Sequence, residues 1–318
     1  MMPDISVIIP VKNGAETLID CLKAITTQQY NGIIEIIILD SNSTDESVNM
    51  GIAYGAKIVK VEEGSFNHGL TRNIGANIAT GELLYFTVQD AWISSEDMLE
   101  KMAIHFEDEE VKSVTGMQAI PHHKNKNPAL WFKRSGEPVS EFYQFKKNEF
   151  QSLTPIKQKE LCCWDNVNAM YRKTALQQQP FIKANLSEDM IWAKQALTKG
   201  WKIIRDPSLL VYHYHHQSFS YNFRVNYAVA YENRKIFGIK PTYPPVFIPF
   251  LRRVNTIRKN HSMSVSGKLY WILHNAGIYF AHTLSAFTFR TALFLGGEKK
   301  LTRSLHFFCN SVPQGQQR

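Results

Sequence analysis

The chain has 318 residues, of which 44% are hydrophobic and 20% charged, with a formal net charge of +8. This composition supports a full hydrophobic core and excludes a wholly disordered chain. Four cysteines without a C-x-x-C pair or a framework spacing argue against a disulfide scaffold, so reduced thiols in a cytoplasmic protein are expected. The first eleven residues lack the basic segment of a signal peptide.

Short apolar runs alternate with helical patterns over the first 90 residues. The expected strands are Ile5–Pro10, Ile33–Leu39, Ala56–Val61 and Leu83–Val88, and the expected helices are Ala15–Thr27 and Thr71–Ala79. Such alternation predicts an α/β fold with a mostly parallel sheet flanked by helices. Asp40 and Asp90 follow strand ends, the edge where such sheets bind ligands. No Gly-x-Gly-x-x-Gly or P-loop motif follows a strand, which argues against dinucleotide oxidoreductases and P-loop enzymes.

The region after Lys240 has a different character and is expected to form basic helices. From Arg224 onward there are 14 Lys and Arg but only Glu232 and Glu298 as acidic residues. Anionic lipid and nucleic acid both remain open as partners of this basic tail.

The last long helical pattern is amphipathic. Its apolar face holds Leu273, Phe280, Leu284, Phe287 and Phe294. Polar residues interrupt the apolar run, so a membrane-spanning helix is not expected. A helix that lies on a membrane and a helix that packs on the catalytic body both fit this pattern.

Seven motifs follow one another along the region Ile5–Phe237. They are Ser6–Asn13, Ile37–Asp45, Phe66–Gly75 with Ala79–Glu82, Gln89–Ala91, Asn166–Asn168, Glu188–Asp189 and His213–His215. Family 2 glycosyltransferases show these motifs in the same order, and the region resembles that family. The resemblance implies a GT-A fold for residues 1–237, the catalytic domain, and a helical C-terminal appendage over residues 238–318, a basic and amphipathic region.

The resemblance also implies a nucleotide-sugar pocket at the strand ends. Asp40 is expected to accept the imide N–H of a uracil or thymine ring, and Arg72 and Asn73 to hold the diphosphate. The full set of expected donor-binding residues is Pro10, Val11, Asn13, Asp40, Ser41, His68, Arg72, Asn73 and Gln89. From the residues alone, a turn or helix-capping aspartate is the more common explanation of Asp40.

A divalent cation, Mg²⁺ or Mn²⁺, is implied at Asp90, which matches the second carboxylate of the family's Asp-x-Asp motif. Val88 replaces the first aspartate of that motif, which is a departure from the family pattern. His213 and His215 are expected to complete the metal site, although structural histidines remain an alternative.

The Glu188–Asp189 motif is implied to carry the chemistry. Asp189 matches the catalytic base, with Glu188 in support, and Asn166 and Asn168 are expected on the acceptor side. Acidic residues in a first helical turn are also favoured by the helix dipole, so this pair has an ordinary explanation as well.

The motifs particularly resemble bacterial rhamnosyltransferases. This implies an inverting transfer from dTDP-rhamnose to a glycan or polyprenyl-linked acceptor for O-antigen or capsule, at the inner face of the plasma membrane. Another UDP- or dTDP-sugar donor, a catalytically silent nucleotide-sugar-binding relative, and a nucleic-acid-binding protein are the alternatives. The basic tail lacks a recognisable groove-reading module, so no nucleic-acid partner is expected.

Overall fold

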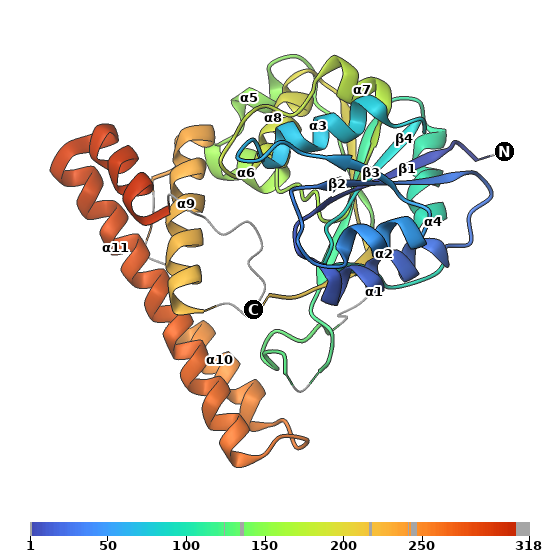
Figure 1. Ribbon diagram of the computed structural model, residues 1–318. Coiled ribbons are helices and arrows are strands. Elements are labelled where there is room, and N and C mark those ends of the chain that lie inside the picture. Colours follow the sequence, from blue (N-terminus) through green and yellow to red (C-terminus); the bar gives the residue numbers. More distant parts are fainter. Residues whose placement is uncertain are drawn as a thin grey trace. The chain divides into compact units, whose positions relative to one another are not determined.

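The computed structural model describes residues 2–123, 125–133, 137–215, 218–240, 242 and 247–309. The chain forms two compact units (Figure 1). Unit 1 comprises Met1–Ala119 and Arg134–His213, and unit 2 comprises Ile120–Lys133 and Tyr214–Arg318. The expected domain boundary was Phe237, whereas the compact units divide after His213. The reason is that helix α9, Phe219–Phe237, packs along the C-terminal helix of unit 2.

Unit 1 is an α/β layer structure. Among the described residues, nine strands form one sheet with the order β3-β2-β1-β4-β8-β6-β9-β5, and β7 pairs with β9. The strands are β1 Ile5–Val11, β2 Ile34–Asp40, β3 Lys57–Lys60, β4 Leu83–Phe86, β5 Ala91–Ile93, β6 Val111–Ala119, β7 Glu141–Tyr143, β8 Ala169–Arg172 and β9 Lys202–His213. The helices are α1 Ala15–Thr26, α2 Ser47–Ala53, α3 His68–Ile78, α4 Met98–Ile104, the 3₁₀ turn η1 His105–Glu107, α5 Glu149–Ser152, α6 Pro155–Leu161, α7 Lys173–Gln178 and α8 Glu188–Thr198.

The sheet is parallel in one half and mixed in the other. Strands β3, β2, β1 and β4 are parallel, as the alternating pattern predicted. Strand β8 runs antiparallel to both of its neighbours, β4 and β6, while β6 and β9 are parallel. The prediction of a mostly parallel sheet therefore holds for the N-terminal half, because only there do helices connect successive strands that are also neighbours in the sheet.

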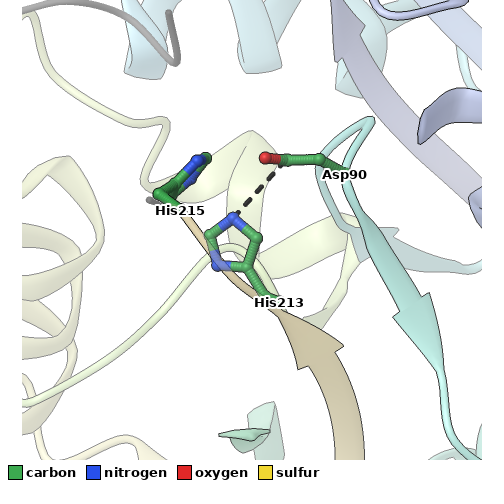
Figure 2. Close-up of side chains that lie close together, drawn as sticks. All are labelled: Asp90, His213 and His215. Atoms are coloured by element: carbon green, nitrogen blue, oxygen red, sulfur yellow. Dashed lines mark ion pairs between the residues drawn. The ribbon is translucent and has the colours of Figure 1, made fainter. Parts of the chain in front are cut away.

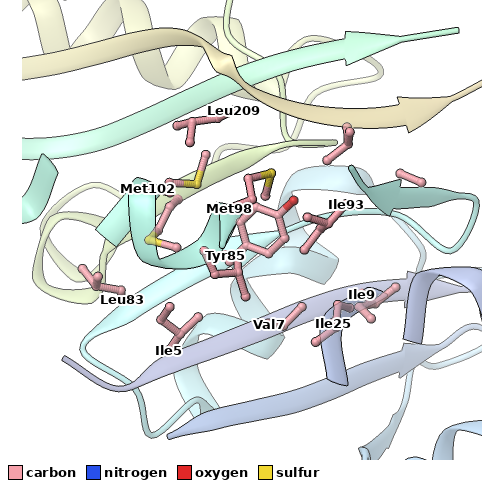
Figure 3. Close-up of a cluster of buried hydrophobic side chains, with 14 of the residues drawn as sticks. Ile5, Val7, Ile9, Ile25, Leu83, Tyr85, Ile93, Met98, Met102 and Leu209 are labelled. Atoms are coloured by element: carbon pink, nitrogen blue, oxygen red, sulfur yellow. The ribbon is translucent and has the colours of Figure 1, made fainter. Parts of the chain in front are cut away.

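The main core of unit 1 lies on one face of the sheet (Figure 3). Ile5 and Val7 of β1, Tyr85 of β4, Ile25 of α1 and Met102 of α4 pack together and are fully buried or nearly so. Each such side chain contributes about 1.5–3 kcal/mol when it leaves water. This packing fixes α1 and α4 on the sheet and so holds the strand ends in place.

The opposite face is covered by α3 and α8 (Figure 1). Helix α3 approaches β1 so closely that a Cβ at Gly75 would lie 2.6 Å from Cγ2 of Ile8. Beside it, the Tyr171 ring meets Phe181 and Trp192 edge to face, with centroids 5.5 and 4.7 Å apart. These aromatic contacts anchor the segment that leads into α8.

Unit 2 is helical, with α10 Phe247–Arg258 and α11 Val265–Cys309 beside α9, so the expected basic helices form. Helix α11 packs against both of the others, and its dihedral angles break at Gly296 and Gly297. No helix among the described residues is both long and apolar enough to span a bilayer.

A buried pair of asparagines fixes the segment Ile120–Lys133 onto the helices of unit 2. The side-chain amides of Asn127 and Asn275 donate to each other's oxygens at 3.1 and 3.2 Å. Arg253 also donates to Asn275, at 2.9 Å. Both asparagines are almost completely buried, so removal of either would leave polar groups unsatisfied.

Candidate active site

The strand ends bring the expected site residues to one edge of the sheet. In the parallel half, Val11 at the end of β1 pairs with Asp40 at the end of β2. Because β8 is antiparallel to β4, its first residue, Ala169, lies opposite Phe86, the last residue of β4. The residues just before β8 and just after β4 therefore share the edge that holds Asp40.

The other half of the sheet supplies histidine to the same edge. Strands β6 and β9 are parallel, with Ala119 opposite Tyr212, so both end there. The short strand β5 then runs antiparallel to β9 and places Ala91 opposite His213. Asp90, one residue before β5, is thereby held beside His213.

Asp90, His213 and His215 point toward one another (Figure 2). Oδ1 of Asp90 lies 3.4 Å from Nε2 of His213, and both side chains are 11% exposed. One ligand atom from each of the three residues lies within 4.8 Å of the others. The three residues predicted as metal ligands are thus brought together by the structure.

This donor set fits a divalent cation. Carboxylate oxygen suits hard cations, and imidazole suits the first-row transition metals. The combination of one carboxylate with two imidazoles favours Mn²⁺ over Mg²⁺, which prefers oxygen ligands and keeps several waters. Val88, which stands where the motif has its first aspartate, is half-buried and packs against the main core instead.

Two loops next to this cluster are tied together by side-chain amides. Oε1 of Gln89 accepts from the Lys12 amide at 2.8 Å, and its Nε2 donates to the Lys12 carbonyl. Asn13, with φ of 48°, accepts from the Thr44 amide at 2.7 Å. Gln89 and Asn13 therefore shape the loops after β1 and β4, and Pro10 and Val11 belong to the strand that carries the first of them.

Asp40 and Ser41 form the tip of β2. Asp40 is 3% exposed, and its Oδ1 accepts from the Ser43 amide at 3.1 Å. The Ser41 amide donates to the Val11 carbonyl at 2.9 Å. The buried hydroxyl of Ser41 has no hydrogen-bond partner among the described residues, and a buried polar group of this kind calls for a partner such as water, an ion or a ligand.

Arg72, an expected diphosphate ligand, is buried and paired with an acidic side chain of the protein. It is 3% exposed, and its Nη1 donates to Oε1 of Glu188 at 2.7 Å. The same Nη1 also lies 3.3 Å from the His68 carbonyl. In this arrangement the guanidinium neutralises the Glu188 carboxylate and links α3 to the start of α8, so it has little surface to offer a ligand.

Asn73 and His68 are the other expected donor ligands on α3. The Asn73 side chain makes two hydrogen bonds to the backbone of Phe181, at 2.8 and 3.1 Å. Burial, together with the nearby Arg72 charge, lowers the pKa of His68 to about 4. His68 is therefore neutral near pH 7.

Asp189 lies in the first turn of α8, after Ser187 with φ of 66°. Its Oδ2 accepts from the Asn166 amide at 3.2 Å, and its Oδ1 accepts from its neighbour Met190 at 2.7 Å. Burial raises the pKa of Asp189 well above its ordinary value, and the nearby carboxylates of Glu188 and Asp165 raise it further. A carboxylate with a raised pKa is suited to accept a proton near neutral pH.

Asn166 and Asn168, the expected acceptor ligands, are buried and satisfied within the protein. Asn166 donates to Glu188 at 3.2 Å and accepts from the Tyr171 hydroxyl at 2.7 Å. Asn168 accepts from the Tyr85 hydroxyl at 3.1 Å and donates to the Leu209 carbonyl at 2.9 Å. Their side chains thus hold the start of β8 in place.

Two residues at this edge were not anticipated from the sequence. Gln118, near the end of β6, contacts His213, and Asp165 contacts Gln118. Asp165 directly precedes the Asn166–Asn168 motif, so its position was a usable signal. Gln118 belongs to no motif, and only the pairing of β6 with β9 reveals its place.

The fold and this edge define a glycosyltransferase of the GT-A type. Residues 6–179 match glycosyl transferase family 2, which is more than half of the chain. The chain belongs to glycosyl transferase family 2, as its motifs predicted.

Among relatives, the O-antigen chain rhamnosyltransferase WbaN of Salmonella anatum is 30% identical over 217 residues, which cover 67% of each chain. The O-antigen chain rhamnosyltransferase RfbN of Salmonella typhimurium is 28% identical over 215 residues, which cover 66% of each. This chain therefore spans about two thirds of the length of both relatives.

Solved structures share the fold at low sequence identity. The mannosyltransferase PcManGT from Pyrobaculum calidifontis, in complex with GDP-Man and Mn²⁺, has a TM-score of 0.56 at 16% identity, covering 98% of this chain and 86% of its own. TarS 1-349 of S. aureus in complex with UDP has a TM-score of 0.53 at 14% identity and covers 91% of each chain. The predicted fold class is confirmed.

Proposed function

We propose that the chain is an inverting rhamnosyltransferase that transfers rhamnose from dTDP-rhamnose to a glycan or lipid-linked acceptor in surface polysaccharide synthesis. The observation that carries this proposal is the meeting of Asp40, the Asp90–His213 pair and Asp189 at one sheet edge. The names of the two Salmonella relatives support the choice of rhamnose. A different UDP- or dTDP-sugar is the second candidate.

In this proposal the donor nucleotide binds at the tips of β1 and β2. Asp40 accepts the imide N–H that thymine and uracil both carry, and Ser41 offers its buried hydroxyl to the nucleoside. Pro10, Val11 and Asn13 form the neighbouring wall of the pocket, and Gln89 holds the loop that leads to Asp90. Since uracil and thymine present the same imide, Asp40 selects for either of these bases. Other residues must recognise the donor sugar.

Asp90, His213 and His215 would hold Mn²⁺ against the donor diphosphate. When bound, the cation neutralises the negative charge that develops on the leaving dTDP. Arg72 is not assigned this task, because its guanidinium already neutralises Glu188. Arg72 instead positions Glu188 through an ion pair, and Asn73 positions the backbone of Phe181 through a hydrogen bond.

Asp189 is the catalytic base in this proposal. Its carboxylate takes the proton from the acceptor hydroxyl while that oxygen forms a bond to C1 of the sugar. The bond between C1 and the diphosphate oxygen breaks in the same step, and its electron pair leaves with dTDP. Attack from the face opposite the leaving group inverts the anomeric carbon. Glu188 is held by Arg72 and Asn166, so it supports Asp189 and does not itself take the proton.

A catalytically silent relative is distinguished by its lack of turnover. The test is thermal unfolding with a panel of nucleotide sugars, with and without Mn²⁺, followed by assay of transfer and donor hydrolysis. We expect dTDP-rhamnose with Mn²⁺ to raise the melting temperature most, since a ligand of the native state stabilises it. A larger shift with another nucleotide sugar would overturn the donor assignment. Binding without transfer or hydrolysis would overturn the enzymatic role.

We also propose that unit 2 binds the surface of an anionic bilayer, where a lipid-linked acceptor resides. The surface concerned, here termed the α11 stripe, consists of Leu269, Leu273, Phe280, Phe287 and Phe294. These side chains are 55–89% exposed. They recur at spacings of four or seven residues, so they lie along one side of the helix.

A second apolar side of the same helix is already used for packing. Trp271, Asn275, Ile278 and Phe289 are buried within the protein. Two residues along a helix differ by about 200°, so Leu273 and Asn275 face opposite ways. An apolar stripe on an already packed helix, in a segment with many more cations than anions, suits the headgroup region of anionic lipid.

Vesicle flotation tests this surface. We expect the wild type to float with vesicles that contain phosphatidylglycerol, and the Phe280→Ser/Phe287→Ser variant to remain in the dense fraction. Phe142→Ser, at an exposed phenylalanine of unit 1, is the matched control and should float. Sedimentation of the wild type away from such vesicles would overturn the membrane proposal without touching the enzymatic one. A duplex gel shift under the same conditions tests nucleic acid as the alternative partner.

A further inference from the structure

Gln118 connects two parts of the site that are far apart in sequence. Its Oε1 lies 2.6 Å from Nδ1 of His213, and its Nε2 donates to Oδ2 of Asp165. The side chain therefore spans from the histidine at the end of β9 to the loop that precedes β8. Neither partner is adjacent to Gln118 in the chain, and strand pairing alone places them together.

The direction of these hydrogen bonds follows from chemistry. An ionised carboxylate only accepts, so the Gln118 amide must turn its NH₂ group to Asp165 and its oxygen to His213. Nδ1 of His213 must then carry a proton, and the neutral tautomer that fits this bond is the Nδ1–H form. The lone pair of that tautomer belongs to Nε2, the nitrogen that faces Asp90 at 3.4 Å.

The tautomer matters because metal ligation requires a lone pair. A ligating histidine almost always donates its other N–H to a carboxylate, a carbonyl or water, which fixes both the tautomer and the ring orientation. Gln118 supplies such an acceptor to His213. The Nε2 lone pair and an oxygen of Asp90 then converge, which is the arrangement that a shared cation stabilises.

The amide nitrogen of Gln118 is linked to the proposed base, Asp189, through the loop before β8. Oδ1 of Asp165 accepts from the Val167 amide at 3.0 Å, which holds the loop before β8 in shape. The next residue in that loop, Asn166, donates its backbone N–H to Asp189 at 3.2 Å. A single side chain thus braces both a metal ligand and the loop that positions the base.

We propose that Gln118 is a positioning residue that fixes the metal-binding tautomer of His213 and locks it to the Asp165 loop. This inference rests on the metal site of the proposed function. It adds a determinant of metal affinity outside the family motifs, and it predicts that the amide oxygen of Gln118, not its bulk, is what the site requires.

Two variants of nearly equal size separate these requirements. Gln118→Met keeps the volume and removes the acceptor. The Gln118→Glu/Asp165→Asn double variant keeps an acceptor for Nδ1–H of His213 and restores the second bond in reverse, because the new amide at position 165 donates to the new carboxylate at position 118. Gln178→Met, at an exposed glutamine that ends α7, is the matched control. Mn²⁺ affinity is measured by the loss of the free Mn²⁺ paramagnetic resonance signal, which requires no turnover.

We expect Gln118→Met to weaken Mn²⁺ binding about 10–100-fold, the usual effect of losing a partner of a metal ligand. Gln118→Glu/Asp165→Asn should stay much closer to the wild type, and Gln178→Met should be unchanged. Equal Mn²⁺ affinity of folded Gln118→Met and wild type would overturn the inference, as would a folded Gln118→Glu/Asp165→Asn variant that binds as weakly as Gln118→Met.

Circular dichroism and thermal unfolding establish that each variant is folded. If Gln118→Met fails to fold, Gln118→Leu and Gln118→Ala provide the same comparison with Gln118→Glu/Asp165→Asn. If the wild type itself binds no Mn²⁺, the metal site of the proposed function fails. If the wild type binds and all variants bind equally, only the role of Gln118 fails.

Discussion

Nη1 of Arg72 lies 2.7 Å from Oε1 of Glu188, and the two side chains are only 4% and 6% exposed. This ion pair joins the N-terminal half of α3 to the first turn of α8, and its two residues are 116 positions apart in the chain. A Cβ at Gly69 would lie 3.2 Å from Cβ of Glu188, so the two helix starts are in close contact. The pair therefore fixes the backbone from which Asp189 projects.

Removal of one partner of this ion pair should destabilise the protein more than replacement of both. We expect Arg72→Met to lower the free energy of unfolding by about 3–5 kcal/mol, because Glu188 would keep a buried charge without its counterion. The Arg72→Met/Glu188→Met double variant should recover much of that loss. Urea unfolding of the two single variants and the double variant gives the coupling energy, and strictly additive effects would contradict a direct pair.

Asp189→Asn should separate chemistry from binding. We expect transfer to fall by about 10²–10⁴-fold, the range that general bases contribute, while dTDP affinity stays at the wild-type value. Because burial and two neighbouring carboxylates raise the pKa of Asp189, its ionised form opposes folding. The variant should consequently melt at the same or a higher temperature at pH 8. A loss of dTDP binding would show that Asp189 contacts the donor instead.

The acid limb of the pH–rate profile should report Asp189. With its pKa raised above the ordinary value, the base is protonated as the pH falls through that raised pKa, and kcat/KM falls with it. Asp165→Asn removes one of the carboxylates that raise this pKa, so the limb should move to lower pH. Initial rates across a pH series at saturating Mn²⁺ measure the shift, and an unmoved limb would argue that another group titrates.

His68 should make the stability fall in mild acid. Its pKa is about 4 in the folded protein against 6.5 as the ordinary value. Between these two values the unfolded chain binds more protons, so the free energy of unfolding decreases as the pH is lowered from about 6.5 to 4. Urea midpoints of the wild type and His68→Gln over this range test the effect. The variant should show a shallower decline, and identical slopes would rule out His68 as the source.

The sequence predicted the N-terminal half of the fold well because its strands are continuous apolar runs that end at turn residues. Asp40 illustrates this, since it ends β2 as expected. The pairing of β5 with β9, which sets Asp90 beside His213, joins residues about 120 positions apart and has no local signature. Long-range pairing of this kind is decided by tertiary structure.

The exposure of the motif side chains was harder to anticipate than their position in the fold. Arg72, Asn73, Asn166 and Asn168 all belong to motifs, and a motif does not tell whether a polar side chain faces a ligand or another buried polar group. In the structure each makes hydrogen bonds to protein atoms. Gln118 shows the converse, because its partners lie on strand β9 and on the loop before β8, and no pattern in the chain marks it.

The most direct test of the account is the affinity for dTDP with and without Mn²⁺, measured by calorimetry for the wild type, Asp90→Asn and His213→Ala. If Asp90 and His213 hold the cation that binds the diphosphate, Mn²⁺ should tighten dTDP binding of the wild type within the roughly 5–150-fold range of coupled sites. Both variants should lose that gain and keep the metal-independent affinity. An undiminished gain in both variants would contradict the account.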